Sequence, residues 1–234
     1  MLHDFLDLFF PRTCVGCRVE LGSDRPESRI CARCFDSLPE FGILRCAFCF
    51  AANPDGKTCA VCRPSHHLDR LFVATDYKSS LAVTMVKECK YRFVKDLAKD
   101  MGRLICKRVQ LGALSENAVI VPVPLHPKRF RYRGFNQAEA VASIISTAFS
   151  IPIAPDALQR SAATSPQADI QNRLVRMNNV VGVFKINKPS AVQNKNVFIV
   201  DDLSTTGSTL NDCARALKSA GAASCIGLVF ARGG

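Results

Sequence analysis

The sequence predicts an α/β protein, with a parallel sheet flanked by helices, that carries a small cysteine-rich module at its N-terminus. Two observations predict this organisation: cysteine pairs crowd the first third of the chain, and strand-like runs alternate with helix-like segments through the rest. A chain of 234 residues, 48% of them hydrophobic, can hold one medium α/β domain and a small appended module. We therefore expect the module over residues 1–68 and the α/β domain over residues 69–234.

Eight of the twelve cysteines form four C-x2-C pairs, which are Cys14/Cys17, Cys31/Cys34, Cys46/Cys49 and Cys59/Cys62. A C-x2-C turn directs two thiolates at one ion, and two such turns complete the four-cysteine shell that structural zinc prefers. Four pairs therefore predict one or two structural zinc ions. Thirteen residues separate the first two pairs and nine separate the last two. These spacings favour sequential pairing, as in tandem zinc ribbons, with interleaved pairing as the alternative.

The start of the chain bears on whether these cysteines bind metal or form disulfides. Residues 1–10 have apolar side chains at helical spacing, interrupted by Asp4 and Asp7, and no basic segment precedes them. A short amphipathic helix is therefore expected there rather than a signal peptide, and no apolar run approaches the roughly 18 residues of a membrane span. We expect a cytoplasmic protein without membrane insertion, in which cysteine pairs bind metal more readily than they form disulfides.

Two smaller groups near these motifs have simpler interpretations. His66 and His67 follow the last cysteine pair and are interpreted as a solvated linker. Four single cysteines lie in apolar patterns without a partner at ligand spacing, so we expect them in the core. These are Cys89, Cys106, Cys213 and Cys225.

Strand and helix signals alternate from residue 71 to the end of the chain. Apolar or β-branched runs predict strands at residues 71–75, 119–121, 197–200 and 225–230. Helical periodicity and end signals predict helices at residues 80–91, 94–111, 137–149 and 208–220. This order predicts a parallel sheet whose ligands bind at the carboxyl ends of the strands.

The segment that follows the predicted strand 197–200 has the composition of a phosphate-binding loop. Asp201 and Asp202 come first, and the loop after them runs into the predicted helix. Its hydroxyl residues and glycine are Ser204, Thr205, Thr206, Gly207, Ser208 and Thr209. Backbone N–H groups, the helix dipole and these hydroxyls favour an anion, while the carboxylates suit sugar hydroxyls or Mg²⁺. The alternative is a plain helix cap, which needs one hydroxyl residue and not five.

This segment closely resembles the phosphoribosyl-pyrophosphate motif of type I phosphoribosyltransferases. Residues 121–129 and 133–138 look like the "VPVPL…R…RGFNQ" signature of the ComF family of competence-associated proteins. A "Q…R..N…F" stretch of that family is matched by Gln167, Arg176, Asn179 and Phe184. The four cysteine pairs also suit the family, so the resemblance spans nearly the whole chain.

The resemblance implies a type I phosphoribosyltransferase-like fold and a set of ligand contacts. Asp201 and Asp202 would bind the ribose hydroxyls of phosphoribosyl pyrophosphate, and the segment from Leu203 to Thr209 its 5′-phosphate, with Mg²⁺ accompanying the diphosphate. Positive charge for the diphosphate would come from Lys128, Arg129, Arg131 and Arg133, unless these residues form a solvated basic run. Ser204 departs from the family, which usually has an aliphatic residue there, and one extra residue separates Gln167 from Arg176.

The net charge of +11 makes polyanions plausible partners, and it arises beyond residue 70, because residues 1–70 contain nine basic and nine acidic side chains. The resemblance implies binding of single-stranded DNA in natural transformation or in the use of external DNA. Candidate contacts to nucleic acid are Lys90, Arg92, Phe130, Arg131, Tyr132, Phe135 and Arg176. The aromatic rings would stack on bases or pack inward. Lys90 and Arg92 would line a nucleic-acid groove or the phosphoribosyl pocket.

Two alternative functions follow from the same residues. The first is an active phosphoribosyltransferase that transfers the pentosyl group to an unidentified nucleobase or amine, although no segment is evident that would recognise a base. The second is an interaction protein in which the zinc module binds other proteins of DNA uptake or recombination.

Overall fold

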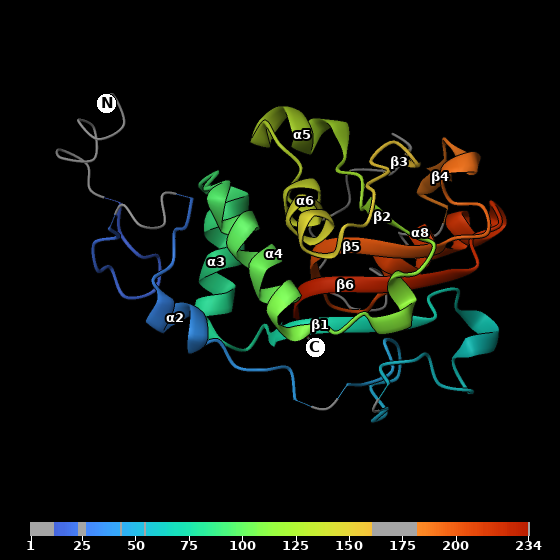
Figure 1. Cartoon of the computed structure of the whole chain (residues 1–234), viewed down its shortest axis with the longest axis horizontal. Coiled ribbons are helices and arrows are strands. Elements are labelled where there is room, and N and C mark those ends of the chain that lie inside the picture. Colours follow the sequence, from blue (N-terminus) through green and yellow to red (C-terminus); the bar gives the residue numbers. More distant parts are fainter. Residues whose placement is uncertain (1–11, 23–26, 43, 54, 161–181, 234) are drawn as a thin grey trace.

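A four-stranded sheet forms the centre of the computed structural model, which describes residues 12–22, 27–42, 44–53, 55–160 and 182–233 (Figure 1). In spatial order its strands are β1 (Arg70–Asp76), β6 (Ser224–Arg232), β5 (Asn196–Ser204) and β2 (Ala118–Pro122). All neighbouring strands pair in parallel, so their carboxyl ends lie along one edge of the sheet. The predicted parallel sheet is confirmed.

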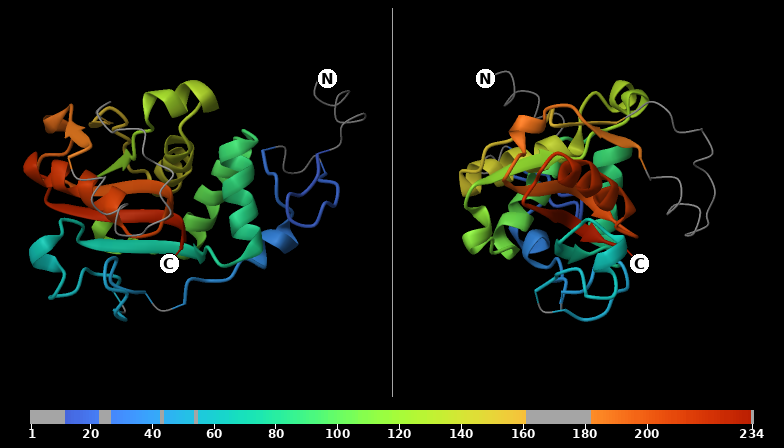
Figure 2. Two further views of the ribbon diagram at one scale, coloured as in Figure 1. Left: turned by 180° about the vertical axis from the view of Figure 1, so that it is seen from behind. Right: turned by 90° about the vertical axis from the view of Figure 1, so that its right-hand side faces the viewer.

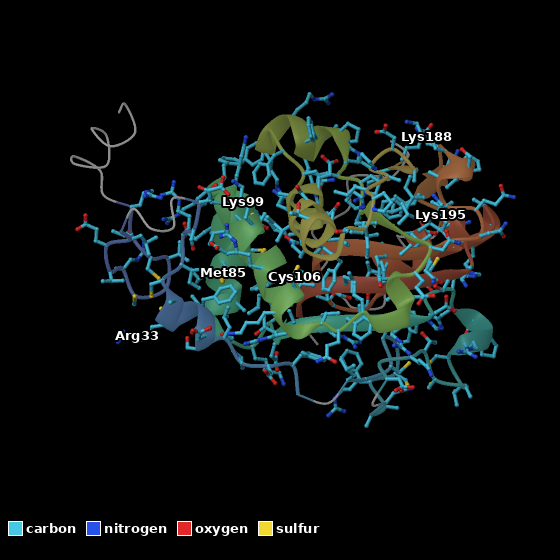
Figure 3. All side chains as sticks on the ribbon, viewed as in Figure 1. Arg33, Met85, Lys99, Cys106, Lys188 and Lys195 are labelled. Carbon is cyan, nitrogen blue, oxygen red and sulfur yellow. The ribbon has the colours of Figure 1, made fainter. Side chains whose placement is uncertain are left out.

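Helices cover both faces of the sheet, because each central strand is apolar on both sides. Along β5, Phe198 and Val200 pack into one core cluster, and Val197 and Ile199 pack into the other. The first face is covered by α3 (Ser80–Tyr91), α4 (Asp96–Arg108) and α6 (Gln137–Phe149). Helix α8 (Ser208–Ser219) covers the second face. Figure 2 shows both faces, and Figure 3 places Met85 of α3 inside the helical layer.

The predicted helices 80–91 and 137–149 agree with α3 and α6 at both ends. Each begins at a capping side chain: Ser79 accepts a hydrogen bond from Ala82 N–H, and Asn136 accepts one from Ala138 N–H. The predicted strands are longer in the structure, most of all β5, which continues through the two aspartates to Ser204. The site therefore begins within a strand and not after it.

Several short elements were not predicted, because seven residues or fewer provide too little periodicity. They are α2 (Ala32–Asp36), α5 (Pro127–Arg133), the antiparallel pair β3 (Leu158–Arg160) and β4 (Phe184–Ile186), and the 3-10 turns Arg63–Ser65, Gly112–Ser115 and Pro189–Ala191. Helix α5 begins where the His126 ring accepts a hydrogen bond from Lys128 N–H, and ends at Gly134, whose φ of 72° is left-handed. This helix carries all four residues of the predicted basic run, Lys128, Arg129, Arg131 and Arg133.

The cysteine-rich segment packs on the α/β domain at two places. Its first half lies beside α3 and α4, where Cys14, Ile30 and Leu38 join the same apolar core as those helices (Figure 1). Its second half lies along the outer strand β1, and Lys57 pairs with Arg70 in an isolated antiparallel bridge. The boundary at residues 68 and 69 stays a prediction.

Two predictions concern residues outside the described ranges, namely the amphipathic helix at residues 1–10 and the DNA contact Arg176. Gln167 and Asn179 of the family motif lie outside them as well. Among the helices that the structure describes, none has the length and apolar character needed to cross a membrane.

Candidate functional site

A cavity of about 680 Å³ opens at the carboxyl edge of the sheet, where the end of β5 faces helix α5. It brings together segments far apart in the sequence: the end of α3, the loop after β2, α5, the end of β3 and the β5–α8 connection. The predicted ligand contacts that line it are Lys90, Lys128, Arg129, Tyr132, Arg133, Asp201, Asp202, Leu203, Thr205 and Thr209. The predicted contacts that do not line it, among the described residues, are Arg92, Phe130, Arg131, Phe135, Ser204, Thr206, Gly207 and Ser208.

The two carboxylates at the end of β5 differ in their surroundings. Asp202 is 4% exposed, and its Oδ1 lies 2.9 Å from Lys90 Nζ, while its buried Oδ2 has no partner among the described residues. Asp201 lies beside it, and burial followed by the charge of Asp202 raises the pKa of Asp201 to about 7. Burial acts against the charge of Lys90, but Asp202 and Asp201 together raise its pKa. Carboxylates that line a cavity can accept hydrogen bonds from sugar hydroxyls or contact a divalent cation.

The phosphate loop, residues 203–209, leads from β5 into the first turn of α8. Gly207 is left-handed, with a φ of 78°, and directly precedes the helix. Thr206 Oγ1 lies 2.7 Å from Ser208 Oγ and accepts a hydrogen bond from Ser208 N–H, so these hydroxyls order the loop itself. Thr205 and Thr209 line the cavity. The N–H groups of the first helical turn favour an anion at this end.

Ser204, the departure from the family pattern, is 4% exposed, and its hydroxyl has no partner among the described residues. It occupies a core position at the end of β5, where an aliphatic residue would bury no polar atom. Ser204 is not among the residues that line the cavity.

Helix α5 forms the basic wall of the cavity. Lys128 and Arg129 are exposed on it, and Arg133 donates a hydrogen bond to Gln137 Oε1 at 3.1 Å. The same guanidinium lies 5.9 Å from the centre of the Tyr91 ring. Arg133 is thus held by neighbours on two helices, whereas the other two side chains are free to move toward an anion.

Arg160, at the end of β3, is a cavity residue that the sequence analysis did not predict. Its Nε is buried without a partner among the described residues, and its guanidinium lies 5.4 Å from the centre of the Phe184 ring. Burial, followed by the charge of Arg129, lowers its pKa. A buried donor of this kind is expected to bond to a ligand or to water. Local sequence does not predict this position, because β3 has only three residues and Arg160 reaches the cavity through the tertiary fold.

The exposed aromatic residues gather between α5 and the end of α3. Tyr132 is 70% exposed and Phe130 is 47% exposed, and the Tyr132 ring meets Phe93 edge to face with 5.3 Å between centres. Phe135 instead packs against the core, with Lys95 Nζ 5.3 Å from its ring centre. Of the three predicted stacking residues, two therefore face solvent and one packs inward.

The eight paired cysteines form two clusters in sequential order, and the alternative of interleaved pairing is not found. The first cluster is Cys14, Cys17, Cys31 and Cys34, and the second cluster is Cys46, Cys49, Cys59 and Cys62. In each, the four sulfur atoms lie within 4.8 Å of one another, and all eight cysteines are free thiols.

The geometry of the clusters suits a tetrahedral metal ion. Two sulfurs bound to one zinc ion at about 2.3 Å would lie about 3.8 Å apart. The Cys17 and Cys31 sulfurs are 3.7 Å apart, and those of Cys49 and Cys59 are 3.6 Å apart. Burial acts to raise the pKa of Cys14 and Cys46, but hydrogen bonds from backbone N–H groups outweigh it and lower the pKa to about 7 and about 6. Burial and hydrogen bonds between the thiols raise the pKa of Cys34 and Cys62 to about 12, so each cluster contains one favoured thiolate and one favoured thiol. The grouping of four sulfurs in each cluster is what suits a zinc ion.

His66 differs from the prediction of a solvated linker. Its ring is half-buried and stacks on Phe48 with 3.6 Å between centres, and its Nδ1 lies 2.8 Å from the carbonyl oxygen of Cys62. The side chain packs across the second cluster and is not among its ligands. His67 is exposed, as expected.

Comparison with known proteins finds one matching family and several relatives. Residues 131–233 match the phosphoribosyl transferase domain. DNA utilization protein YhgH of Salmonella typhi is 31% identical over 158 residues, which cover 66% of this chain and 68% of that protein. Competence protein F of Haemophilus influenzae is 26% identical over 225 residues, which cover 91% and 93%. A glutamine phosphoribosylpyrophosphate amidotransferase of Bacillus subtilis is 18% identical, with a TM-score of 0.39, over 58% of this chain and 26% of that one.

The parallel sheet, the flanking helices and the matched domain make this a protein of the type I phosphoribosyltransferase-like class, extended at its N-terminus by two cysteine clusters. Within that class, the chain belongs to the ComF family. Relatives in this family carry names that refer to DNA utilization and to competence.

Proposed function

We propose that this protein binds phosphoribosyl pyrophosphate, or a related nucleotide phosphate, together with Mg²⁺, and that it acts on single-stranded DNA in the cytoplasm during DNA uptake or the use of external DNA. One observation carries the proposal: a single cavity is lined by two carboxylates, by residues of the phosphate loop and by the basic side chains of helix α5. A sugar between two phosphate groups needs this distribution of charge.

Each part of the ligand has a matching part of the cavity. Asp201 and Asp202 would accept hydrogen bonds from the ribose hydroxyls, and the phosphate loop would bind the 5′-phosphate. The diphosphate would lie toward helix α5, where Lys128, Arg129 and Arg133 are joined by the partly buried Arg160. Mg²⁺ bound with the diphosphate would offset its charge.

Calorimetric titration of the zinc-loaded protein with phosphoribosyl pyrophosphate and Mg²⁺ tests this assignment. Saturable binding is expected, and Arg160→Gln is expected to weaken it about 10- to 100-fold, because a charge-assisted hydrogen bond contributes about 1.5–3 kcal/mol. Lys188→Gln is the control, since Lys188 is exposed and pairs with Asp156 away from the cavity. An affinity unchanged by Arg160→Gln would remove Arg160 from the proposed contacts.

Binding of single-stranded DNA is supported by the exposed aromatic and basic side chains beside the cavity. Tyr91, Phe130 and Tyr132 are large exposed rings, and Arg92 and Arg131 lie next to them in the sequence. Rings that stack on bases, together with cations that follow the phosphates, are typical of single-strand binders. The names of the relatives supply the biological context of DNA utilization and competence.

Fluorescence anisotropy with a labelled single-stranded oligonucleotide tests this interaction. Tyr132→Ala is expected to weaken binding about 5- to 100-fold, because stacking contributes about 1–3 kcal/mol per base. A plot of log K for DNA binding against log salt concentration has a negative slope. Arg131→Ala is expected to make this slope less steep by about 0.7, and the control Lys188→Ala is expected to leave it unchanged. Equal affinities for all four proteins would place the DNA elsewhere.

Catalysis is a second candidate that the same cavity supports, since charge stabilisation alone can promote departure of a diphosphate. Release of pyrophosphate on addition of a nucleobase or an amine would identify the protein as an active transferase. Binding without release would leave the ligand as an effector of DNA handling.

A further inference from the structure

The second cysteine cluster lies directly beside the phosphate loop. Its first turn, Cys46–Cys49, contacts the backbone at Gly207: a Cβ on this glycine would lie 3.3 Å from the Ala47 carbonyl oxygen and 3.4 Å from Phe48 Cε1. Ala47 is fully buried in the same core cluster as Leu210 of α8. The first turn of the second cysteine cluster and the turn into α8 are therefore packed against each other without intervening space.

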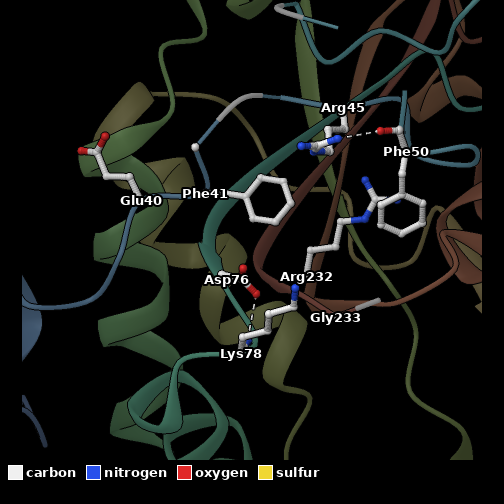
Figure 4. A pocket seen from close by; sticks show the side chains of 9 residues that line it. Glu40, Phe41, Arg45, Phe50, Asp76, Lys78, Arg232 and Gly233 are labelled. Carbon is white, nitrogen blue, oxygen red and sulfur yellow. Dashed lines mark hydrogen bonds between the residues drawn. The ribbon is translucent and has the colours of Figure 1, made fainter. Parts of the chain in front are cut away.

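Arg232, the last residue of β6, binds the same turn from the sheet. Its Nη2 donates a hydrogen bond to the Ala47 carbonyl at 2.6 Å, and its guanidinium lies 3.9 Å from the centre of the Phe50 ring. Figure 4 shows the Arg232 side chain directed toward Phe50. In the sheet, Arg232 is opposite Ser204, and the next residue, Gly233, donates its N–H to the Ser204 carbonyl at 3.0 Å. The arginine thus joins the cluster to the strand end from which the phosphate loop leaves.

The segment that follows the last cysteine of this cluster, Cys62, also forms hydrogen bonds to α8. Asn211 Oδ1 accepts hydrogen bonds from His67 N–H at 2.7 Å and from Leu68 N–H at 3.3 Å. Asn211 lies in the first turn of α8, and its own N–H donates to the Gly207 carbonyl at 2.9 Å. The first turn of α8 is therefore held between two chain segments of the second cysteine cluster, one at Ala47 and the other at His67 and Leu68.

A side-chain stack joins those two segments. The ring of Phe48, from the first turn, lies on the ring of His66, which follows the second turn and contacts the Cys62 carbonyl. A metal ion bound to all four sulfurs would fix the same two segments relative to each other. Loss of the metal would release both sides of the α8 first turn.

The first cluster has a different neighbourhood. A Cβ on Gly16 would lie 2.9 Å from Leu81 Cδ1 of α3, and Ser28 donates a hydrogen bond to Asp100 of α4. Arg108 of α4 donates to the Pro39 carbonyl at 2.6 Å, in the segment that follows this cluster. All of these contacts are to the helical layer on the other side of the molecule from α8.

We infer that the second cysteine cluster positions the phosphate loop, so that metal in this cluster and a phosphoribosyl ligand in the cavity strengthen each other's binding, whereas the first cluster has no such effect. The inference rests on the proposed function for the identity of the ligand. Because linkage is reciprocal, the factor by which metal improves ligand affinity equals the factor by which ligand improves metal affinity.

Arg232→Gln separates the cluster from the loop, and Arg108→Gln is its matched control, since both arginines bind carbonyl groups of the cysteine-rich segment. Phe48→Leu is a second test variant that keeps Arg232 in place. With all proteins loaded with zinc, amide hydrogen exchange of residues 205–211 is compared first, because it needs no ligand. We expect exchange at least about tenfold faster in Arg232→Gln and Phe48→Leu, and unchanged in Arg108→Gln.

The second measurement is release of zinc to a chromogenic chelator with and without phosphoribosyl pyrophosphate and Mg²⁺. We expect the ligand to slow release of one of two zinc ions in the wild type and in Arg108→Gln, and to have a smaller effect in Arg232→Gln. Equal exchange in all variants, or a ligand that binds without slowing release, would overturn the inference and leave the proposed function intact. A wild type that shows no ligand binding overturns the proposed function and the coupling together.

Discussion

Cys31→Ser is expected to lower the melting temperature by about 10 °C or more and to reduce the zinc content from two ions per chain to one. Cys31 belongs to the first cluster, and its side chain also caps helix α2 by accepting a hydrogen bond from Cys34 N–H. The segment held by this cluster places Ile30, which is 1% exposed, and Leu38, which is 2% exposed, in the core beside α3 and α4. Opening the cluster would expose these side chains, and the burial of each contributes about 1.5–3 kcal/mol to stability. The contribution of the bound metal to stability would be lost as well.

Cys106→Ser is the control for this prediction. Cys106 is half-buried on α4, lies outside both clusters, and burial raises the pKa of its thiol to about 11. Circular dichroism melts and metal analysis of the purified variants provide the measurements. A Cys31→Ser protein that retains two zinc ions and the wild-type melting temperature would contradict the assignment of the cluster.

Asp201→Asn and Asp202→Asn are expected to change stability in opposite directions, although the two residues are adjacent. The folded-state pKa of Asp201 is about 7, above the ordinary value of 3.8, so the stability gained from its neutral form is present below about pH 4 and is lost as the pH rises through 7. Asparagine keeps the neutral form at every pH. Asp201→Asn should therefore stabilise the protein at pH 8 by at most about 4 kcal/mol, and much less at pH 4.5.

Asp202→Asn removes the carboxylate that lies 2.9 Å from Lys90 Nζ, whose side chain is only 20% exposed. Loss of the hydrogen-bonded carboxylate beside a largely buried ammonium is costly, so we expect a loss of about 2–3 kcal/mol at pH 8. Denaturant unfolding of both variants at pH 4.5 and pH 8 measures the two effects. Destabilisation of equal size in both variants at pH 8 would show that burial and the charge of Asp202 do not destabilise the ionised form of Asp201.

The phosphate loop could be predicted from the sequence because its parts are contiguous: strand, aspartates, hydroxyls, glycine and helix follow one another in thirteen residues, from Val197 to Thr209. The cysteine clusters could be predicted for the same reason. The capping residues Ser79 and Asn136 are local signals that mark where α3 and α6 begin, so the predicted starts of these helices agree with the structure.

The rest of the site depends on contacts between distant residues. Arg160 enters the cavity through the pairing of two three-residue strands, which carry almost no periodic signal. The sequence does not determine the direction of Phe135, because an aromatic residue beside a basic run suits either a core or a surface. The contact of Ala47 with Gly207 joins residues 160 positions apart and has no counterpart in local sequence. Tertiary packing determines such contacts, and propensity does not.

Backbone amide NMR of the zinc-loaded protein, titrated with phosphoribosyl pyrophosphate and Mg²⁺, is the decisive experiment, because it reports where a ligand binds as well as whether it does. We expect saturable shifts concentrated at residues 201–209 and in helix α5. Shifts concentrated instead around the separate cavity beside Arg232 and Lys78, or no shifts in a folded protein, would contradict it.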